Sequence, residues 1–231
     1  PRSRCLATGR RPLSRLDPPL NDRPTPLAGR LFPAESAEAL LAHIHPHSDL
    51  IVPLANGEPS LLLDTVEAAA ARGDLEGVTV HQMHALSDRP YLHGAYGDRL
   101  RHVSYFLSHV TRPCYLAGTL DLVPNHFSEV FSHMQRRTND PLVIATAAPP
   151  DRHGYFSLGV SADYTSSFIG RARFFLEANA QMPRTFGRNQ IHISQVAGWV
   201  EAEYPLIEVA PVEPSDTDRA IGGFVAERIR D

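Results

Sequence analysis

Short apolar runs alternate with segments of helical periodicity from residue 35 onward. The apolar run DLIVPLA at 49–55 is followed by the turn NGEPS, and then by residues 60–72, whose apolar positions recur at helical spacing and stop before Gly73. The next apolar run, VTVHQM, occupies 78–83. Together they predict a strand, a tight turn, a helix and a second strand, which is how a parallel sheet begins.

The remaining chain repeats this alternation. Apolar runs predict further strands at 102–108, 141–147, 173–179, 190–194 and 198–203, and helical spacing predicts helices at 37–44, 128–136, 163–169 and 216–229, the last with Ser215 as N-cap. Strands that alternate with helices predict an α/β fold with a mostly parallel sheet and flanking helices. In such a fold, ligands bind at the carboxyl ends of the strands.

Two polar loops follow predicted strands at that edge. ANGEP, at 55–59, joins a strand to a helix as phosphate-binding loops do, but its single glycine matches neither the dinucleotide nor the P-loop fingerprint. The competing interpretation is a simple turn with Gly57 at positive φ and Pro59 starting the helix. The second loop, APPDRHGYFSLG at 148–159, crowds titratable and aromatic residues into a connector that needs only turn residues. This density indicates that something is bound there.

Nucleophile and metal motifs are incomplete. Ser161 in LGVSAD approaches the G-x-S-x-G nucleophile motif, but Asp163 stands where the second small residue belongs, so a turn or N-cap serine is favoured. The histidines of HIHPH at 43–47 and the pair His81 and His84 are not accompanied by a metal-binding helix motif. We therefore expect partly buried or exposed histidines and no metal.

Composition excludes several classes of protein. All 22 Lys+Arg positions are arginine, which excludes a Schiff-base lysine, a P-loop lysine and a lysine general base. The net charge of −4 and the scattered arginines disfavour a nucleic-acid partner. Without an apolar run of about eighteen residues or a signal-peptide pattern, we expect no membrane partner and a cytoplasmic location. Cys5 and Cys114 fit no metal or redox spacing, and we expect no disulfide.

Composition also divides the chain into three parts. Residues 1–32 are rich in Arg and Pro without periodicity, and we expect a flexible extension there. An α/β domain is expected at 33–214. Residues 215–231 are expected to form a helix that leads to a further domain outside this sequence.

Several motifs resemble those of one family. APPDRHGYFSLG, EANAQMPRTFG and IHISQVAGWVE, in this order and at this spacing, resemble the amino-terminal half of the acetyl-CoA hydrolase/transferase family, which includes 4-hydroxybutyrate and acetate CoA-transferases. NGEPSLLL resembles the first glycine loop of that family. The resemblance implies an α/β domain of the CoA-transferase type, a coenzyme A thioester as substrate and no cofactor. The substrate-binding or domain-interface positions that it implies are Asn56, Gly57, Pro59, His153, Gly154, Tyr155, Asn179 and Met182.

The reaction that the resemblance implies moves CoA between short-chain carboxylates. A catalytic glutamate attacks the acyl-CoA thioester, a mixed anhydride forms, CoA returns to give a glutamyl-CoA thioester, and an incoming carboxylate takes the CoA. In the family this glutamate lies in the carboxyl-terminal half, and Glu58, Glu177 and Glu201 do not occupy its motif, so no catalytic residue is assigned here. The expected partners are acyl-CoA, a short-chain carboxylate and a carboxyl-terminal half, and a homodimer stays open.

Two other classes of function stay open beside this half-enzyme. One is a non-catalytic acyl-CoA-binding module or an inactive fragment. The other is a self-sufficient thioesterase that uses Ser161 or a pair of histidine and carboxylate. An exposed apolar face, where a second half would pack, would favour the half-enzyme.

Overall fold

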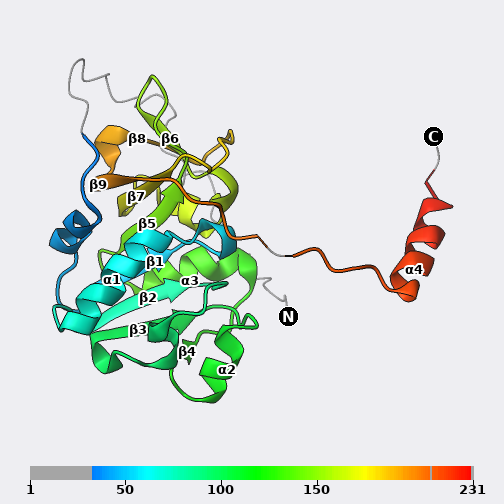
Figure 1. Ribbon diagram of the computed structural model, residues 1–231, viewed down its shortest axis with the longest axis horizontal. Coiled ribbons are helices and arrows are strands. Elements are labelled where there is room, and N and C mark those ends of the chain that lie inside the picture. Colours follow the sequence, from blue (N-terminus) through cyan, green and yellow to red (C-terminus); the bar gives the residue numbers. More distant parts are fainter. Residues whose placement is uncertain (1–32, 209, 230–231) are drawn as a thin grey trace, which may run out of the picture. The chain divides into compact units, whose positions relative to one another are not determined.

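The computed structural model describes residues 33–208 and 210–229, so the extension predicted for 1–32 lies outside the described residues. Within them, seven parallel strands form one sheet in the order β4-β3-β2-β1-β5-β7-β9 (Figure 1). The strands are β1 (Asp49–Val52), β2 (Val78–Gln82), β3 (Leu100–Ser104), β4 (Asp121–Leu122), β5 (Leu142–Ala147), β7 (Arg173–Asn179) and β9 (Gly198–Ala202). The predicted α/β fold with a mostly parallel sheet and flanking helices is confirmed.

The helices are mostly short. The α-helices are α1 (Ser60–Arg72), α2 (Thr111–Leu116), α3 (Val130–Arg137) and α4 (Asp216–Ala226). The 3-10 helices are η1 (Ala37–His43), η2 (Ala55–Gly57), η3 (Pro90–His93), η4 (Gly97–Arg99), η5 (Phe127–Glu129), η6 (Gly159–Ser161), η7 (Tyr164–Phe168) and η8 (Ile193–Gln195).

The order of the strands reverses at the centre of the sheet. β1 and β5 are neighbours there, although β2, β3 and β4 separate them along the chain. One half of the sheet therefore extends outward from β1 and the other from β5. A reversal of this kind opens a crevice at the carboxyl ends of the two central strands. The loops that follow β1 and β5 are the two polar loops that the sequence singled out.

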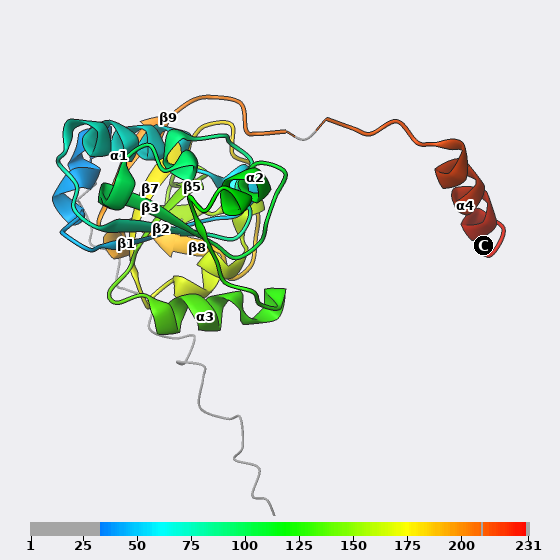
Figure 2. The ribbon, with the colours of Figure 1, turned by 90° about the horizontal axis from the view of Figure 1, so that it is seen from below.

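Each face of the sheet carries its own apolar core, and Figure 2 shows α1 and α3 on opposite faces. The core beneath α1 includes Leu50, Val52, Val80, Ile144 and Phe175 of the strands with Leu62, Leu63 and Val66 of the helix. The core beneath α3 includes Ile51, Val143, Phe174 and Leu176 with Val130 and Met134 of the helix. Because both faces are covered, the central strands are mainly apolar on both faces instead of alternating between apolar and polar residues.

α1 ends as its sequence predicts. Its apolar residues repeat at helical spacing, and Gly73 follows its last turn with φ +88°, a left-handed conformation that glycine adopts without steric cost. The Gly73 N–H donates to the Ala70 carbonyl oxygen at 3.2 Å. The helix predicted at 60–72 and its glycine end are therefore confirmed.

The strand predicted at 102–108 is displaced toward the amino terminus. β3 pairs residue by residue with β2 and ends at Ser104, whose Oγ donates to the Phe106 carbonyl oxygen at 2.7 Å. Ser108 instead precedes α2, and its Oγ accepts from the Thr111 N–H at 3.1 Å. The apolar run gave no sign of where pairing with β2 stops, and α2 was not predicted because it has six residues, one of them proline.

Two predicted helices are tighter than α-helices. The helix expected at 163–169 is the 3-10 helix η7, and Asp163 is its N-cap because Asp163 Oδ1 accepts from the Thr165 N–H at 2.7 Å. Ser161 is therefore a turn serine inside η6 and the N-cap prediction for it is wrong. The helix expected at 37–44 is likewise the 3-10 helix η1.

A small two-stranded sheet takes up part of the second predicted loop. β6 (Tyr155–Ser157) pairs antiparallel with β8 (Gln190–His192) in a separate two-stranded sheet. Of the strand predicted at 190–194, residues 190–192 form β8, outside the parallel sheet, and the following residues belong to the 3-10 helix η8. Phe156 of β6 is fully buried in the core beneath α3, which explains why this loop contains aromatic residues.

α4 begins at the predicted N-cap. Ser215 Oγ accepts from the Asp218 N–H at 3.2 Å, and Asp218 Oδ2 accepts from the Ser215 N–H at 2.8 Å. Its apolar residues Ile221, Phe224 and Val225 are 56%, 65% and 56% exposed. Among the residues that the structure describes, no helix is long and apolar enough to cross a membrane.

Candidate functional site

The loop after β1 turns at an alanine. Ala55 has φ +50°, and its N–H donates to the His84 carbonyl oxygen at 2.8 Å. The positive φ predicted at Gly57 is therefore found at Ala55 instead. Gly57 is needed for close approach, because a Cβ there would lie 2.1 Å from Ser161 Oγ. Pro59 is the N-cap of α1, so the helix starts at Ser60, as its spacing predicts, and not at Pro59, as the turn interpretation has it.

We expect Gly57→Ala to lower the free energy of unfolding by about 1–3 kcal/mol, the usual cost of forcing extra volume into a packed site. The new Cβ would lie 2.1 Å from Ser161 Oγ and 2.8 Å from Pro53 Cβ. Urea unfolding measures the change. Adding Ser161→Gly should restore part of the loss, and Gly222→Ala, where a Cβ meets nothing within 4 Å, should cause no loss. A Gly57→Ala chain as stable as the original would contradict the close packing.

The Glu58 carboxylate is turned into the protein. Glu58 is 3% exposed, and its Oε1 accepts from the Leu86 N–H at 2.6 Å and from Gln82 Nε2 at 3.1 Å. Its Oε2 has no hydrogen-bond partner among the described residues. Burial lowers the pKa of the nearby His84, and Glu58 opposes that shift. The polar groups of Glu58 and Gln82 hold the loop after β1 against the segment after β2.

Asp163 holds the same loop from the other side. Its Oδ2 accepts from the Leu54 N–H at 2.8 Å, in addition to the N-cap bond to Thr165. Burial raises the pKa of Asp163 to about 6, and these two N–H donors oppose the shift. Tyr164 fixes the neighbouring strand ends, because its hydroxyl donates to the Val52 carbonyl oxygen and accepts from the Met83 N–H at 3.1 Å.

The loop after β5 makes a tight turn just before β6. Asp151 Oδ1 accepts from the His153 N–H at 2.8 Å and from the Tyr155 N–H at 3.0 Å, while Gly154 has φ +81°. Burial by itself would raise the pKa of Asp151, but these N–H donors and Arg184 lower it. Part of the polar crowding that the sequence showed is therefore needed to build the turn.

Arg184, in the loop after β7, is bonded to the loop after β5. Its Nη2 donates to the carbonyl oxygens of Pro149 at 2.7 Å and of Tyr155 at 2.8 Å. Close packing joins them a second time, because Gly159 has φ +60° and a Cβ there would lie 2.3 Å from Met182 Sδ. The loops after β5 and β7 are thus one packed unit.

The structure divides the eight predicted site residues into two groups. Gly57 contacts η6 through Ser161, and Met182 contacts η6 through Gly159, so η6 joins the loops after β1 and β7. Asn56 Nδ2 donates to the Ile207 carbonyl oxygen. Pro59 lies in the same loop, and Asn179 at the end of β7 donates from its Nδ2 to the Tyr204 carbonyl oxygen at 2.9 Å.

The second group lies in the turn before β6 and at the first residue of that strand. Tyr155 pairs with His192, their rings lie 4.9 Å apart, and Gly154 packs beside the same histidine. His153 is exposed and accepts from Arg152 Nε at 3.0 Å. Gly154 and Tyr155 therefore contact His192 of β8, while His153 lies in the turn that precedes β6.

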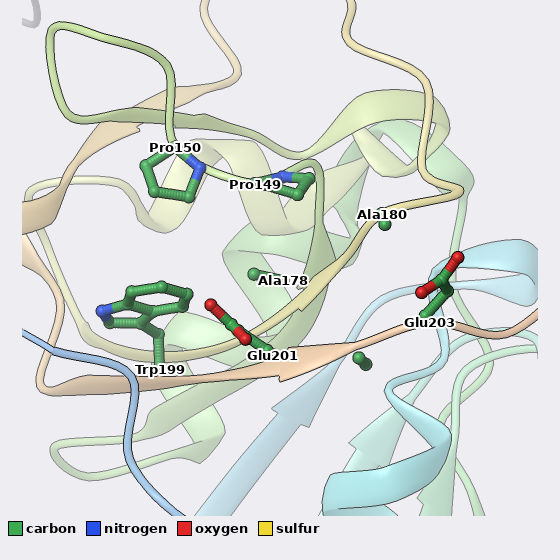
Figure 3. A pocket seen from close by; sticks show the side chains of 8 residues that line it. Pro149, Pro150, Ala178, Ala180, Trp199, Glu201 and Glu203 are labelled. Atoms are coloured by element: carbon green, nitrogen blue, oxygen red, sulfur yellow. The ribbon is translucent and has the colours of Figure 1, made fainter.

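A cavity of about 590 Å³ opens beside the carboxyl ends of β7 and β9. It is lined by Pro149, Pro150, Ala178, Ala180, Trp199, Glu201, Ala202 and Glu203. Figure 3 shows Trp199 and Glu201 of β9 on the side of the two prolines, while Glu203 lies farther along the chain. The alanines leave room above β7, and the exposed carboxylates give the mouth a negative charge. Among the described residues, no group of three metal-ligating side chains comes together.

Sequence reasoning missed the residues that hold these loops together. Arg184, Asp163 and Tyr204 act through contacts with residues distant in sequence, which no local pattern shows. Glu177 did give a signal, because it is the one charged residue inside the apolar stretch 174–178. A carboxyl group in a fully buried strand requires polar partners.

The amino-acid sequence matches a known domain. The model of the acetyl-CoA hydrolase/transferase N-terminal domain matches residues 33–213. Succinyl-CoA:cyclohexane-1-carboxylate CoA transferase of Geobacter metallireducens is 34% identical over 185 residues, which are 79% of this chain and 41% of the relative. 4-Hydroxybutyrate coenzyme A transferase of Clostridium kluyveri is 33% identical over 199 residues, 85% of this chain and 46% of the relative. The chain thus spans less than half the length of these relatives.

Solved structures give the same result. RipA from Yersinia pestis has a TM-score of 0.80 at 29% identity, covering 86% of this chain and 48% of its own. 4-Hydroxybutyrate CoA-transferase from Porphyromonas gingivalis has a TM-score of 0.62 at 25% identity, covering 78% of this chain and 42% of its own. The fold, the order of the motifs and the matched domain agree, and this chain belongs to the acetyl-CoA hydrolase/transferase family.

Proposed function

We propose that this chain is the amino-terminal half of an enzyme that moves CoA between short-chain carboxylates, with the nucleophilic glutamate supplied by a carboxyl-terminal half. The observation that carries the proposal is the apolar surface of the segments that follow the strands. Phe106 after β3, Val160 in η6 and Phe186 after β7 are 48%, 53% and 87% exposed. Large apolar side chains exposed beside a candidate site favour an interface that a second half covers.

The carboxylates of this chain are poorly placed to attack a thioester. Glu58 and Glu177 are 3% and 0% exposed, and oxygens of both accept backbone N–H bonds. A nucleophile must reach the thioester carbon with an available oxygen. Glu201 and Glu203 are both exposed and line the cavity, and substitution of Glu201, which lies in β9 itself, tests whether a carboxylate of this cavity attacks the thioester.

The proposed transfer balances without water. A glutamate oxygen attacks the acyl carbon of the thioester, and the CoA thiolate departs. The product on the protein is a mixed anhydride of the glutamate and the acyl group. The thiolate then attacks the glutamyl carbonyl and releases the first carboxylate. The second carboxylate then attacks the glutamyl thioester and displaces the CoA thiolate, which forms a new mixed anhydride. The thiolate attacks the acyl carbon of this anhydride, so the new acyl-CoA leaves and the glutamate is regenerated. Water would hydrolyse the anhydride, so a transferase has to exclude it from the site. We propose that the loops after β1, β5 and β7 form one wall of that site and that the second half closes it.

Exchange of CoA tests this proposal directly. Acetyl-CoA and propionate are mixed with this chain alone and with the chain joined to a carboxyl-terminal half of the family, and mass spectrometry detects propionyl-CoA. We expect no product from the chain alone and product from the joined protein. Borohydride reduction of the glutamyl thioester, followed by peptide mapping, should label a glutamate of the carboxyl-terminal half.

Glu201→Gln in the joined protein is the matched control and should keep the exchange. Loss of exchange in that variant, or exchange by the chain alone, would place the nucleophile in this chain and overturn the proposal. A joined protein that folds, binds acyl-CoA and transfers nothing would favour a binding module.

A further inference from the structure

The connector that follows β9, residues 203–208, is fastened to the candidate site by side-chain hydrogen bonds. The Tyr204 hydroxyl donates to Glu177 Oε1 and accepts from the Ser60 N–H at 3.1 Å. Asn56 Nδ2 donates to the Ile207 carbonyl oxygen. The connector therefore contacts the middle of the segment between β1 and α1 at Asn56 and the first residue of α1 at Ser60.

β7 completes the attachment. Asn179 Nδ2 donates to the Tyr204 carbonyl oxygen at 2.9 Å, and its Oδ1 accepts from the Tyr204 N–H at 3.5 Å and from the Gln181 N–H at 2.9 Å. Asn179 is fully buried. An amide that is buried and engaged on both sides holds the connector backbone in one position.

Glu177 explains why a tyrosine is suited to this position. Its carboxyl is fully buried, and burial raises its pKa to about 7. Glu177 Oε2 accepts from the Leu62 N–H at 3.1 Å in the first turn of α1, while Asp64 of the same helix disfavours a second negative charge. The Tyr204 hydroxyl donates to the other oxygen of Glu177. The same hydroxyl accepts from the Ser60 N–H, which has no partner within the helix because Ser60 is the first residue of α1.

We propose that Tyr204 is a positioning residue that couples the connector to the loop 55–59, so that neither can move without the other. One consequence rests on the proposed function. Because of the coupling, the path of the connector toward the second half depends on the conformation of the loop 55–59. Closure of a second half over the loop would then be transmitted through Tyr204 and Asn56.

Hydrogen exchange at single amides, followed by NMR, tests the coupling without any acyl transfer. Tyr204→Phe should raise the exchange rate of the Ser60 amide about tenfold, because a hydrogen bond of this kind is lost. The Leu62 amide, which Glu177 holds, should change less than about twofold and serves as an internal reference. Tyr115→Phe, at a tyrosine that is 42% exposed, is the matched control and should change neither amide.

Asn56→Ala provides the reciprocal measurement and a second route if Tyr204→Phe folds poorly. It should accelerate exchange at the Tyr204 amide, and the two substitutions together should be less than additive, since each opens the same unit. Additive effects, or a connector that loosens while the loop amides keep their rates, would overturn the proposal. Because exchange is measured without substrate, an inactive protein with coupled amides would contradict only the proposed function.

Discussion

Replacing Arg89 with leucine is expected to lower the free energy of unfolding by about 3–5 kcal/mol, because removing one member of a buried ion pair leaves the other charge uncompensated. Arg89 Nη1 donates to Glu67 Oε2 at 3.0 Å and to Asp64 Oδ1 at 2.8 Å. The side chains of Arg89 and Glu67 are only 9% and 11% exposed. Without the guanidinium, the Glu67 carboxylate of α1 would stay buried, and among the described residues the Tyr91 N–H at 3.3 Å is the hydrogen-bond donor left to it.

Urea unfolding of two further variants separates the buried pair from the exposed one. The Asp64 side chain is 68% exposed, so Asp64→Asn should cost less than about 1 kcal/mol. Arg89→Leu combined with Glu67→Leu should recover most of the loss, since both charges are then removed. If the double variant were as unstable as Arg89→Leu alone, packing of the arginine stem and not its charge would explain the loss.

The Arg89 network also positions the candidate site. Arg89 Nη2 donates to the Ser60 carbonyl oxygen at 3.3 Å, at the residue where α1 begins. The same residue's N–H is held by Tyr204. The first residue of α1 is therefore held by Arg89 of the segment after β2 and by Tyr204 of the connector. Substitution of Arg89 is expected to loosen the loop 55–59 as well.

The central strands and α1 could be predicted because their signals are local. The run 173–179 has an apolar centre, Phe174–Leu176, since β7 is covered on both faces, and the structure gives the predicted bounds of the strand. Helical spacing at 60–72 followed by Gly73 similarly contains its own stop signal. These elements place the loops after β1 and β5 at the carboxyl edge, which is as far as local pattern extends.

The inner geometry of the site depends on contacts between distant residues. Ser60 and Tyr204 are 144 positions apart, and nothing beside either residue indicates the other. Gly57 shows the same limit, because its small size is required by Ser161 and not by its own φ. β6 and β8 escape prediction as a pair for a further reason: each has three residues, too few for a periodicity to appear.

His102→Leu is expected to make the chain less sensitive to acid. His102 in β3 is 1% exposed, its ring lies 5.7 Å from that of Tyr91, and neither ring nitrogen has a hydrogen-bond partner among the described residues. Burial lowers the pKa of His102 to about 3, and His81 adds a smaller repulsion. Protonation in the folded state is therefore strongly disfavoured, whereas the unfolded chain takes up this proton near pH 6.5.

The sign of the pH dependence follows from that difference. Between pH 6.5 and 3 the unfolded state binds more protons at His102 than the folded state does. The free energy of unfolding is therefore unaffected by His102 above pH 6.5 and decreases as the pH falls below it. At pH 5 the loss is roughly 2 kcal/mol, at about 1.4 kcal/mol for each pH unit. Leucine has a similar volume and no proton to bind, so the variant should be more stable than the original chain by about this amount at pH 5.

Urea unfolding at pH 5 and pH 7.5 measures the effect as a difference between the two chains. Burial raises the pKa of Glu177 and of Asp163, which favours folding as the pH falls, but both residues are present in both chains and cancel in the comparison. His153→Asn, at an exposed histidine, is the control and should leave the pH dependence unchanged. If the original chain and His102→Leu lost equal stability between the two pH values, proton uptake at another group would drive acid unfolding, and His102 would have to find a partner for its proton inside the fold.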